Sequence, residues 1–464
     1  MAETIGELKT GVGEAGSLEA FGYKQELKRA LSFWDLIVFG LIFISPTAPM
    51  AVFGSVYNHA HGMPSLVYLI GLVAMLFTAL SYRTMARAFP VAGSAYAFAT
   101  RGIGVSVGFF AGWAMLLDYV MVPTLAYVFA AAALNAMFPD LPRWVALMGF
   151  IVVVTITNVL GVEATSRFNK LMLWVQLLVL AAFVVMAVIG ITHGVAGAKV
   201  STAPLFQKGF VTPPLLFGAL SIAALSFLGF DGISTLSEEA KGGSSAVGRA
   251  TILCLCIAAV LFVLQTWLAS LFVLGKPAFA GGDASDHAFV DISAIVGGQW
   301  LKFGCAVLCI ALGSAACALA GQAACARLIF GMARDGKLPR FLAHVSGKRR
   351  SPERATLIIA AITVVVGLLA LDQLELLSTL VNFGAMTGFL LVHVAVLWHF
   401  GLKPGRNWFE HVLSPILGFA IIAYVVWNMD EKAQLLGAAW LVIGLVVLLI
   451  LKLRKQPLEA LPEA

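Results

Sequence analysis

Long apolar stretches recur along almost the whole chain, and they constrain its fold more than any other feature. A helix that crosses the hydrocarbon core of a bilayer needs about 20 mostly apolar residues. Twelve stretches of suitable length are centred in 33–56, 64–86, 105–134, 143–161, 167–191, 212–238, 249–275, 300–333, 355–371, 376–400, 411–428 and 433–452. We therefore expect an all-α polytopic membrane protein, surrounded by lipid, with about 12 transmembrane helices and no separate soluble domain.

The composition agrees with this expectation. Of the 464 residues, 60% are apolar and 12% are charged, whereas soluble domains have roughly 45–50% apolar and about 25% charged residues. These values exclude a soluble enzyme, a disordered protein and a nucleic-acid-binding module, so we expect no nucleic-acid partner.

The basic residues predict the orientation of the spans, because loops on the cytoplasmic side carry an excess of Lys and Arg. If the N-terminus is cytoplasmic, 24 of the 30 Lys and Arg residues fall on cytoplasmic segments and 6 fall outside. The net charge of +6 is then mostly a topology signal. We expect residues 1–30 to form a cytoplasmic tail without a signal peptide, the C-terminus to be cytoplasmic too, and the protein to lie in a bacterial inner membrane.

Two of the predicted spans are interrupted. Span one contains Pro46 and Pro49, each of which removes a backbone donor and disfavours helix at the preceding residue. Span six has Gly229 and Gly232 on either side of Asp231. Proline kinks that a membrane helix tolerates are one interpretation. Two breaks five spans apart are instead typical of inverted-repeat secondary transporters, whose unwound segments bind substrate and ion.

Three further motifs carry a family resemblance. They are FPVAGSAYAFATRGIGVSVGFFAGW (Phe89–Trp113), FLGFDGISTLSEEA (Phe227–Ala240) and MARDGKLP (Met332–Pro339). All three resemble the amino acid–polyamine–organocation permeases, and the similarity extends over nearly the whole chain. Within this family, LLDY (Leu116–Tyr119), SFLGFD and VNFGAMTGFLLV (Val381–Val392) are most similar to bacterial putrescine importers.

The resemblance implies the leucine-transporter-type fold, a 5+5 inverted repeat with broken helices 1 and 6. The transport core would span residues 31–400, with repeat one at about 31–192 and repeat two at about 211–400. Residues 401–464 would hold the peripheral helices 11 and 12 and a short cytoplasmic C-terminus. The implied function is secondary active transport by alternating access, in which an amine, polyamine or amino acid is imported.

The predicted substrate-binding residues lie at the two breaks and in the adjoining motifs. They are Ser45, Pro46, Thr47, Ala48, Tyr96, Phe227, Gly229 and Asp231. Amino-acid carriers of this family usually have a glycine-rich break in span one, whose amides hold the α-carboxylate of the substrate. Here two prolines remove two amides from that segment. We therefore favour an amine or polyamine, or a compound whose carboxylate is not its main binding group.

Titratable residues inside the membrane are costly and are candidates for function. Asp231 either binds a substrate ammonium or the coupling proton, as an acidic residue does in similar exchangers, or caps the inner half of span six. Asp118 either carries the proton or makes a buried hydrogen bond. Glu238 and Glu239 form either an inner gate or ion-pair latch, or a solvated helix end. His393 either joins a proton path or is hydrogen-bonded within the helix bundle.

The coupling ion is inferred by elimination. Some proton-coupled relatives have a lysine in span five, where this chain has Gln176. The second sodium site of the implied fold commonly uses adjacent hydroxyl residues in span eight, where Ser314 stands alone here. We favour proton symport through Asp231 or Asp118. An amino acid or amine exchanger is the alternative.

Proteins of other classes fit less well. A membrane-embedded enzyme needs paired acids, a His cluster or a Ser/Lys dyad, but the eight histidines are scattered. The six cysteines lie in spans seven and eight without metal-ligand spacing, so no metal or cofactor is expected. There is no GxxxxGK[ST] sequence for ATP. Two breaks in mid-membrane favour a binding site over the continuous pore of a channel.

Overall fold

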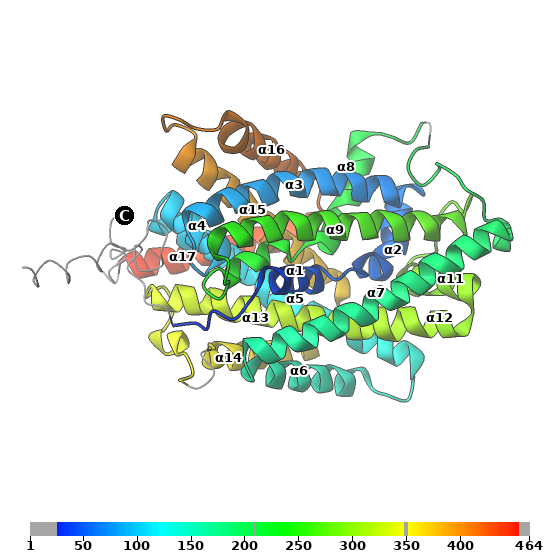
Figure 1. Cartoon of the computed structure of the whole chain (residues 1–464), viewed down its shortest axis with the longest axis horizontal. Coiled ribbons are helices and arrows are strands. Elements are labelled where there is room, and N and C mark those ends of the chain that lie inside the picture. Colours follow the sequence, from blue (N-terminus) through cyan, green and yellow to red (C-terminus); the bar gives the residue numbers. More distant parts are fainter. Residues whose placement is uncertain (1–25, 208, 348–350, 454–464) are drawn as a thin grey trace, which may run out of the picture.

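The computed structural model describes residues 26–207, 209–347 and 351–453. These residues form helices, and the β-type pairing among them is an isolated bridge between Leu31 and Ala240. Most helices run along the long axis of the molecule (Figure 1). The main helices are α1 Phe33–Ile44, α2 Ala48–His59, α3 Pro64–Ala88, α4 Ser94–Gly102, α5 Val105–Met137, α6 Arg143–Val159, α7 Val162–Thr192, α8 Pro213–Ala223, α9 Gly243–Leu271, α11 Ala288–Gly297, α12 Gln299–Phe303, α13 Leu312–Arg334, α14 Glu353–Leu369, α15 Leu374–Phe400, α16 Ser414–Trp427 and α17 Glu431–Leu453. Shorter elements are η2 Val195–Gly197, η3 Ala224–Phe227, η4 Phe230–Leu236, α10 Asp283–Asp286, η5 Gly304–Ala311, η6 Arg340–Ala343 and η7 Phe409–Leu413.

Each predicted span coincides with one helix or one interrupted helix. In the described part of the chain, nine helical segments are long and apolar enough to cross a membrane, and α1 with α2 form a tenth, bent by 42°. Spans four and nine are α6 and α14, which have 17 residues each, at the lower limit of about 17 residues for crossing. The prediction of an all-α polytopic membrane protein is confirmed. The short helices α4, α10 and α11, which lie in connections between spans, were not predicted.

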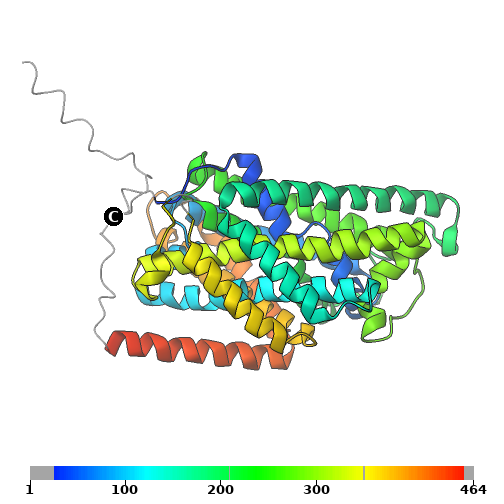
Figure 2. The same cartoon turned by 90° about the horizontal axis from the view of Figure 1, so that it is seen from below.

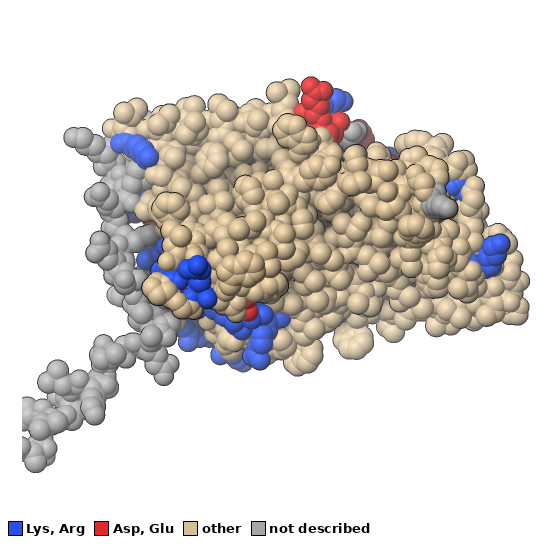
Figure 3. Space-filling model, turned by 90° about the horizontal axis from the view of Figure 1, so that it is seen from above, with Lys and Arg blue, Asp and Glu red and all other residues tan. Residues whose placement is uncertain are grey.

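The two ends of the molecule differ in charge. α3 ends and α5 begins at the same end, with α4 between them (Figure 1). We call this the basic end, because most of the Lys and Arg side chains on the face shown in Figure 3 lie toward it. Arg101 of α4 and Arg334 at the end of α13 belong to it. The opposite end holds α10 and α11.

The interrupted helices lie inside the bundle. α1 packs against α9, α13 and η4, α3 packs along α9, and α5 packs against both α13 and α15. α16 and α17 lie at the edges, and Figure 2 shows α17 running along the outside of the bundle. Apolar side chains of α17 are exposed there, among them Val442 at 60% and Ile443 at 51%. Such a surface suits contact with lipid.

The first break lies at residues 45–47, between α1 and α2. Pro46 cannot donate a backbone hydrogen bond, and Ser45 has a φ of 63°, which a non-glycine residue adopts rarely. The α2 helix then starts with Pro49 in its first turn, where the missing N–H costs little. The predicted interruption of span one is present.

The second break lies at Leu228 and Gly229, between η3 and η4. Leu228 is extended, with a ψ of 139°, and Gly229 has a φ of 120°. A Cβ atom at position 229 would also lie 2.7 Å from the backbone carbonyl carbon of Phe43 in α1. Glycine is therefore required for both the conformation and the close approach of the two broken helices.

Candidate substrate-binding site

A cavity lies where the two breaks meet. Its volume is about 90 Å³, and a single water needs about 10–15 Å³ on this measure, so it has room for a small organic molecule. Its walls are formed by Phe43, Ile44, Ser45, Thr47, Ala48, Ala51, Val52, Val122, Leu125, Ala126, Phe129, Leu225, Ser226, Leu228, Cys309, Ile310, Ser314 and Cys317. Several of these residues follow the first break on α2 or precede the second break. The cavity therefore extends from the breaks toward the end opposite the basic end.

The cavity wall is mostly apolar and carries no charged side chain. Its hydroxyl groups belong to Ser45, Thr47, Ser226 and Ser314. Ser226 is bonded to Tyr68, with 3.0 Å between the two hydroxyl oxygens. Apolar walls with a few placed polar groups are the usual form of a small-molecule site.

The backbone amides of the first break are almost all used or absent. Ser45 N donates to Ile42 O at 3.2 Å, Ala48 N to Ser45 O at 3.0 Å and Met50 N to Thr47 O at 2.9 Å. Positions 46 and 49 are prolines and have no N–H. Of residues 45–50, all described, only Thr47 has an amide outside these contacts. The first break therefore has almost no free N–H group that could donate to a carboxylate.

Side chains from two other helices hold this break in place. Gln176 of α7 accepts hydrogen bonds from the hydroxyls of Ser45 (3.2 Å) and Thr47 (3.1 Å). Gln265 of α9 donates through Nε2 to Pro46 O at 2.9 Å. Gln265 is buried, and its Oε1 has no partner among the described residues.

Asp231 lies directly behind the second break. It is 1% exposed. Tyr119 of α5 donates a hydrogen bond of 2.5 Å to Asp231 Oδ2, and Gly229 N donates one of 3.3 Å to Oδ1. Tyr119 Oη also lies 3.3 Å from Ser94 Oγ at the start of α4. Asp231 thus joins η4 to α5 and accepts a hydrogen bond from a backbone amide of the second break, and both of its predicted roles stay predictions. It does not line the cavity in this conformation.

Asp118 precedes Tyr119 on α5 and is equally buried, at 2% exposed. Its Oδ1 has no hydrogen-bond partner in the part of the chain that the structure describes. A buried carboxylate without a full set of partners is unfavourable unless it is protonated or takes a ligand. Its role as a proton carrier stays a prediction.

Glu238 and Glu239 form two buried ion pairs at the basic end. Arg334 donates to both oxygens of Glu238, at 2.8 and 3.2 Å, and Ala92 N donates to the same carboxylate at 3.0 Å. Arg327 donates to both oxygens of Glu239. The glutamate side chains are 0% and 3% exposed. The alternative of a solvated helix end is therefore wrong, and we call the two pairs the latch, because they join the end of η4 to α13.

A turn next to the latch belongs to the MARDGKLP motif. Asp335 accepts a hydrogen bond of 2.7 Å from Tyr96, and Gly336 follows with a φ of 71°. Burial lowers the pKa of the Lys337 ammonium, with Asp335 acting in the opposite direction. Tyr96, a predicted cavity residue, thus lies at the basic end near the latch.

Two other candidates lie within the packed bundle. Phe227 is buried and its ring contacts those of Tyr68 and Phe262, with centroids 5.8 and 5.2 Å apart. His393 is buried between the hydroxyls of Thr78 (3.2 Å) and Ser81 (2.9 Å). His393 is therefore hydrogen-bonded within the helix bundle, which is the second of the two roles expected from the sequence.

The cavity brings together only part of the predicted set. Ser45, Thr47 and Ala48 line it, while the Pro46 carbonyl is bound by Gln265, and Gly229 and Asp231 lie behind its wall. The prediction omitted the wall that α5 provides. Its residues Val122, Leu125, Ala126 and Phe129 are spaced i, i+3, i+4 and i+7, which places them on one helix face. This spacing can be recognised in the sequence, but it does not show what this face of α5 contacts.

A metal-dependent site is not formed by the described residues. No group of three or more His, Cys, Asp or Glu side chains among them is placed to hold a metal ion. The six cysteines are free thiols, and four of them are buried.

The chain is similar to known proteins over nearly its whole length. The model of the family described as amino acid permease matches residues 31–451. The low-affinity putrescine importer PlaP of Escherichia coli (strain K12) is 32% identical over 431 residues, which cover 91% of this chain and 93% of the importer.

Two relatives have other names. The branched-chain amino acid permease BcaP of Bacillus subtilis (strain 168) is 26% identical, with 91% of this chain and 93% of the permease covered. The methylthioribose transporter of the same strain is 25% identical, with 93% and 95% covered. A chain of membrane-spanning helices that matches this family over nearly its whole length is a transporter and not an enzyme. It belongs to the amino acid permease family.

Proposed function

We propose that this protein imports an amine or polyamine across the bacterial inner membrane by alternating access, in symport with protons. The observation that carries the proposal is the cavity at the two breaks, which extends away from the basic end, while the latch joins η4 to α13 at that end. The basic end faces the cytoplasm in this proposal, because Lys and Arg are enriched on the cytoplasmic side of membrane proteins.

The amine assignment rests on the first break. An α-carboxylate needs several free amides, and residues 45–50 have almost none to offer. Carbonyl groups at helix breaks suit an ammonium group instead. The similarity to a putrescine importer supports the same substrate class. The relatives named for branched-chain amino acids and for methylthioribose make an amino acid or a neutral compound the second candidate.

The proton assignment rests on Asp231 and Asp118. Both are buried, and one oxygen of Asp118 is unpartnered among the described residues. Asp118 directly precedes Tyr119 on α5, and Tyr119 donates a hydrogen bond to Asp231. The hydroxyls of the first break are bonded to the amide of Gln176. This arrangement leaves them less available to a sodium ion, whose ligands are oxygens.

The substrate class is tested by uptake of labelled putrescine into cells that express the protein, with an unlabelled panel of amines and amino acids as competitors. Diamines should compete and α-amino acids should not. Competition by α-amino acids alone would refute the amine assignment.

Coupling is tested by separate Asp231→Asn and Asp118→Asn variants in proteoliposomes with an imposed pH gradient. At least one variant should lose the dependence of uptake on the gradient. Unchanged dependence in both would eliminate both residues. Stimulation of uptake by substrate inside the vesicles, without any need for a gradient, would support the exchanger.

A further inference from the structure

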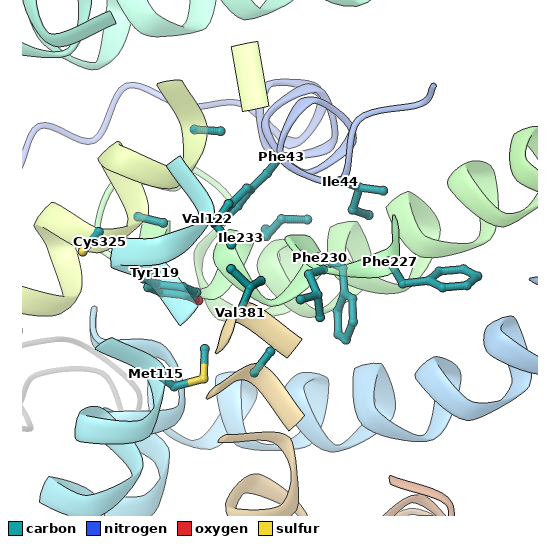
Figure 4. Packing of buried hydrophobic residues seen from close by; sticks show 14 of the residues in the cluster. Phe43, Ile44, Met115, Tyr119, Val122, Phe227, Phe230, Ile233, Cys325 and Val381 are labelled. Atoms are coloured by element: carbon teal, nitrogen blue, oxygen red, sulfur yellow. The ribbon is translucent and has the colours of Figure 1, made fainter. Parts of the chain in front are cut away.

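The floor of the cavity is the ring of Phe43, in the last turn of α1. Phe43 lines the cavity and is 2% exposed. Figure 4 shows its side chain pointing from α1 toward Val122 and Tyr119 of α5. Phe43 lies at the end of the cavity that is nearer to the carboxylates of Asp118 and Asp231.

Three glycines make room for Phe43. A Cβ atom at Gly232 would overlap the ring, one at Gly321 would lie 3.1 Å from its Cε2, and one at Gly229 would lie 2.9 Å from its Cγ. These glycines come from η4, α13 and the second break. The ring therefore fills the narrow space between the two broken helices and α13.

The acidic groups lie on the other side of this ring. The rings of Phe43 and Tyr119 have centroids 6.1 Å apart, and Tyr119 donates to Asp231. Asp118 is four residues before Val122, a wall residue, and so lies on the same face of α5 about 6 Å nearer the basic end. The wall of α5 thus continues past the floor to a buried carboxylate, one oxygen of which has no partner in the described part of the chain.

Residues four apart on α13 follow the same order, from the cavity wall past the Phe43 ring toward the basic end. Cys317 lines the cavity, Gly321 borders the Phe43 ring, and Cys325 follows and is fully buried. Figure 4 shows Cys325 beyond Phe43, on the side of Tyr119 and Met115. Two native thiols therefore lie above and below the floor.

We propose that Phe43 is a specificity-determining residue that sets the depth of the substrate cavity and separates it from Asp118 and Asp231. With the ring in place, a substrate is limited to the cavity above it. With the ring removed, the cavity extends to the carboxylates and admits longer diamines. The inference deepens the proposed function and rests on it for the substrate class, while the position of the floor can be tested without any substrate.

The test uses the reactivity of the two thiols in full-length protein. In one background Cys317 is the only cysteine left and in the other Cys325 is, with the remaining five replaced by Ala. A membrane-impermeant, cationic methanethiosulfonate reagent is applied outside intact cells, and labelling is followed by mass spectrometry. The variants are Phe43→Ala and the milder Phe43→Leu. Phe227→Ala is the matched control, because Phe227 is an equally buried phenylalanine at the second break whose ring points away from Phe43.

With Phe43 intact, Cys317 should react and Cys325 should react about tenfold more slowly or not at all, since thiol reactivity requires access. Phe43→Ala should raise the Cys325 rate about tenfold, Phe43→Leu should raise it less, and Phe227→Ala should leave it unchanged. Retained Cys317 labelling shows that each variant is folded. In competition assays the same Phe43 variants should favour longer diamines.

Two outcomes overturn the inference in different ways. Fast labelling of Cys325 with Phe43 intact would refute the role of Phe43 as the floor of the cavity. An unchanged Cys325 labelling rate in both Phe43 variants, with Cys317 still reactive, would refute it too. Either result would leave the proposed function standing. Absence of Cys317 labelling in unaltered Phe43 protein would refute the outward-facing cavity, and the floor with it.

Discussion

The latch gives the sharpest energetic prediction. Glu239 and Arg327 are 3% and 7% exposed, and their two hydrogen bonds include one of 3.0 Å between Arg327 Nη2 and Glu239 Oε2. Glu239→Gln removes the negative charge and leaves a buried guanidinium whose other bond, of 2.7 Å, is to Ala323 O. Removing one partner of a buried ion pair costs about 3–5 kcal/mol, because the remaining charge is uncompensated.

We therefore expect Glu239→Gln to lower the free energy of unfolding by about 3 kcal/mol, the low end of that range, since Gln keeps one acceptor oxygen. The double variant with Arg327→Met removes both charges and should recover most of the loss. The measurement is a denaturant titration of the purified protein in mild detergent.

The matched control is Asp372→Asn, at an ion pair with Arg143 whose side chains are 79% and 43% exposed. Water screens this pair, so its loss should cost about 0–1 kcal/mol. The reasoning would fail if Glu239→Gln were as harmless as Asp372→Asn, or if the double variant were no more stable than the single one.

Three further predictions concern the site and the far end of the molecule. Tyr119→Phe removes the hydrogen bond to the Asp231 carboxylate, which is worth about 1.5–3 kcal/mol. The variant should show reduced uptake driven by a pH gradient in proteoliposomes. Uptake that still follows the gradient as in the wild type would count against a role of Tyr119 in coupling. Gln176→Leu leaves the two hydroxyls of the first break without their acceptor, so it should cost about 1–3 kcal/mol in a denaturant titration, and an unchanged midpoint would contradict it. Asn58→Ala removes both hydrogen bonds to the backbone of Phe279, of 3.0 and 2.8 Å, and hydrogen exchange should rise in the connection around 279 but not at the latch; the same protection around 279 in the variant and in the wild type would refute this.

Much of the fold was predictable from local pattern. Spans such as α3 and α9 are apolar runs long enough to cross a bilayer, and nothing distant in the sequence is needed to identify them. The breaks were predictable for the same reason, since Pro46 and Gly229 act on their own backbone.

The candidate site was predictable only in part. Ser45, Thr47 and Ala48 line the cavity because they belong to the break itself. Phe43 and Val122 were missed because an apolar residue in an apolar helix gives no sign of what it faces. The sequence left open whether Glu238 is solvated or paired, since its partner Arg334 is 96 positions away.

The sequence by itself thus determined the class of protein, the order of its apolar helices and the places where two of them unwind, because bilayer thickness and backbone chemistry act on consecutive residues. The tertiary structure decided which groups meet at those places. It set Phe43 against three glycines, bound Asp231 to Tyr119 and buried the two glutamates of the latch with their arginines. Those contacts join residues far apart in the chain, and their energies depend on burial and distance, which arise only when the helices pack.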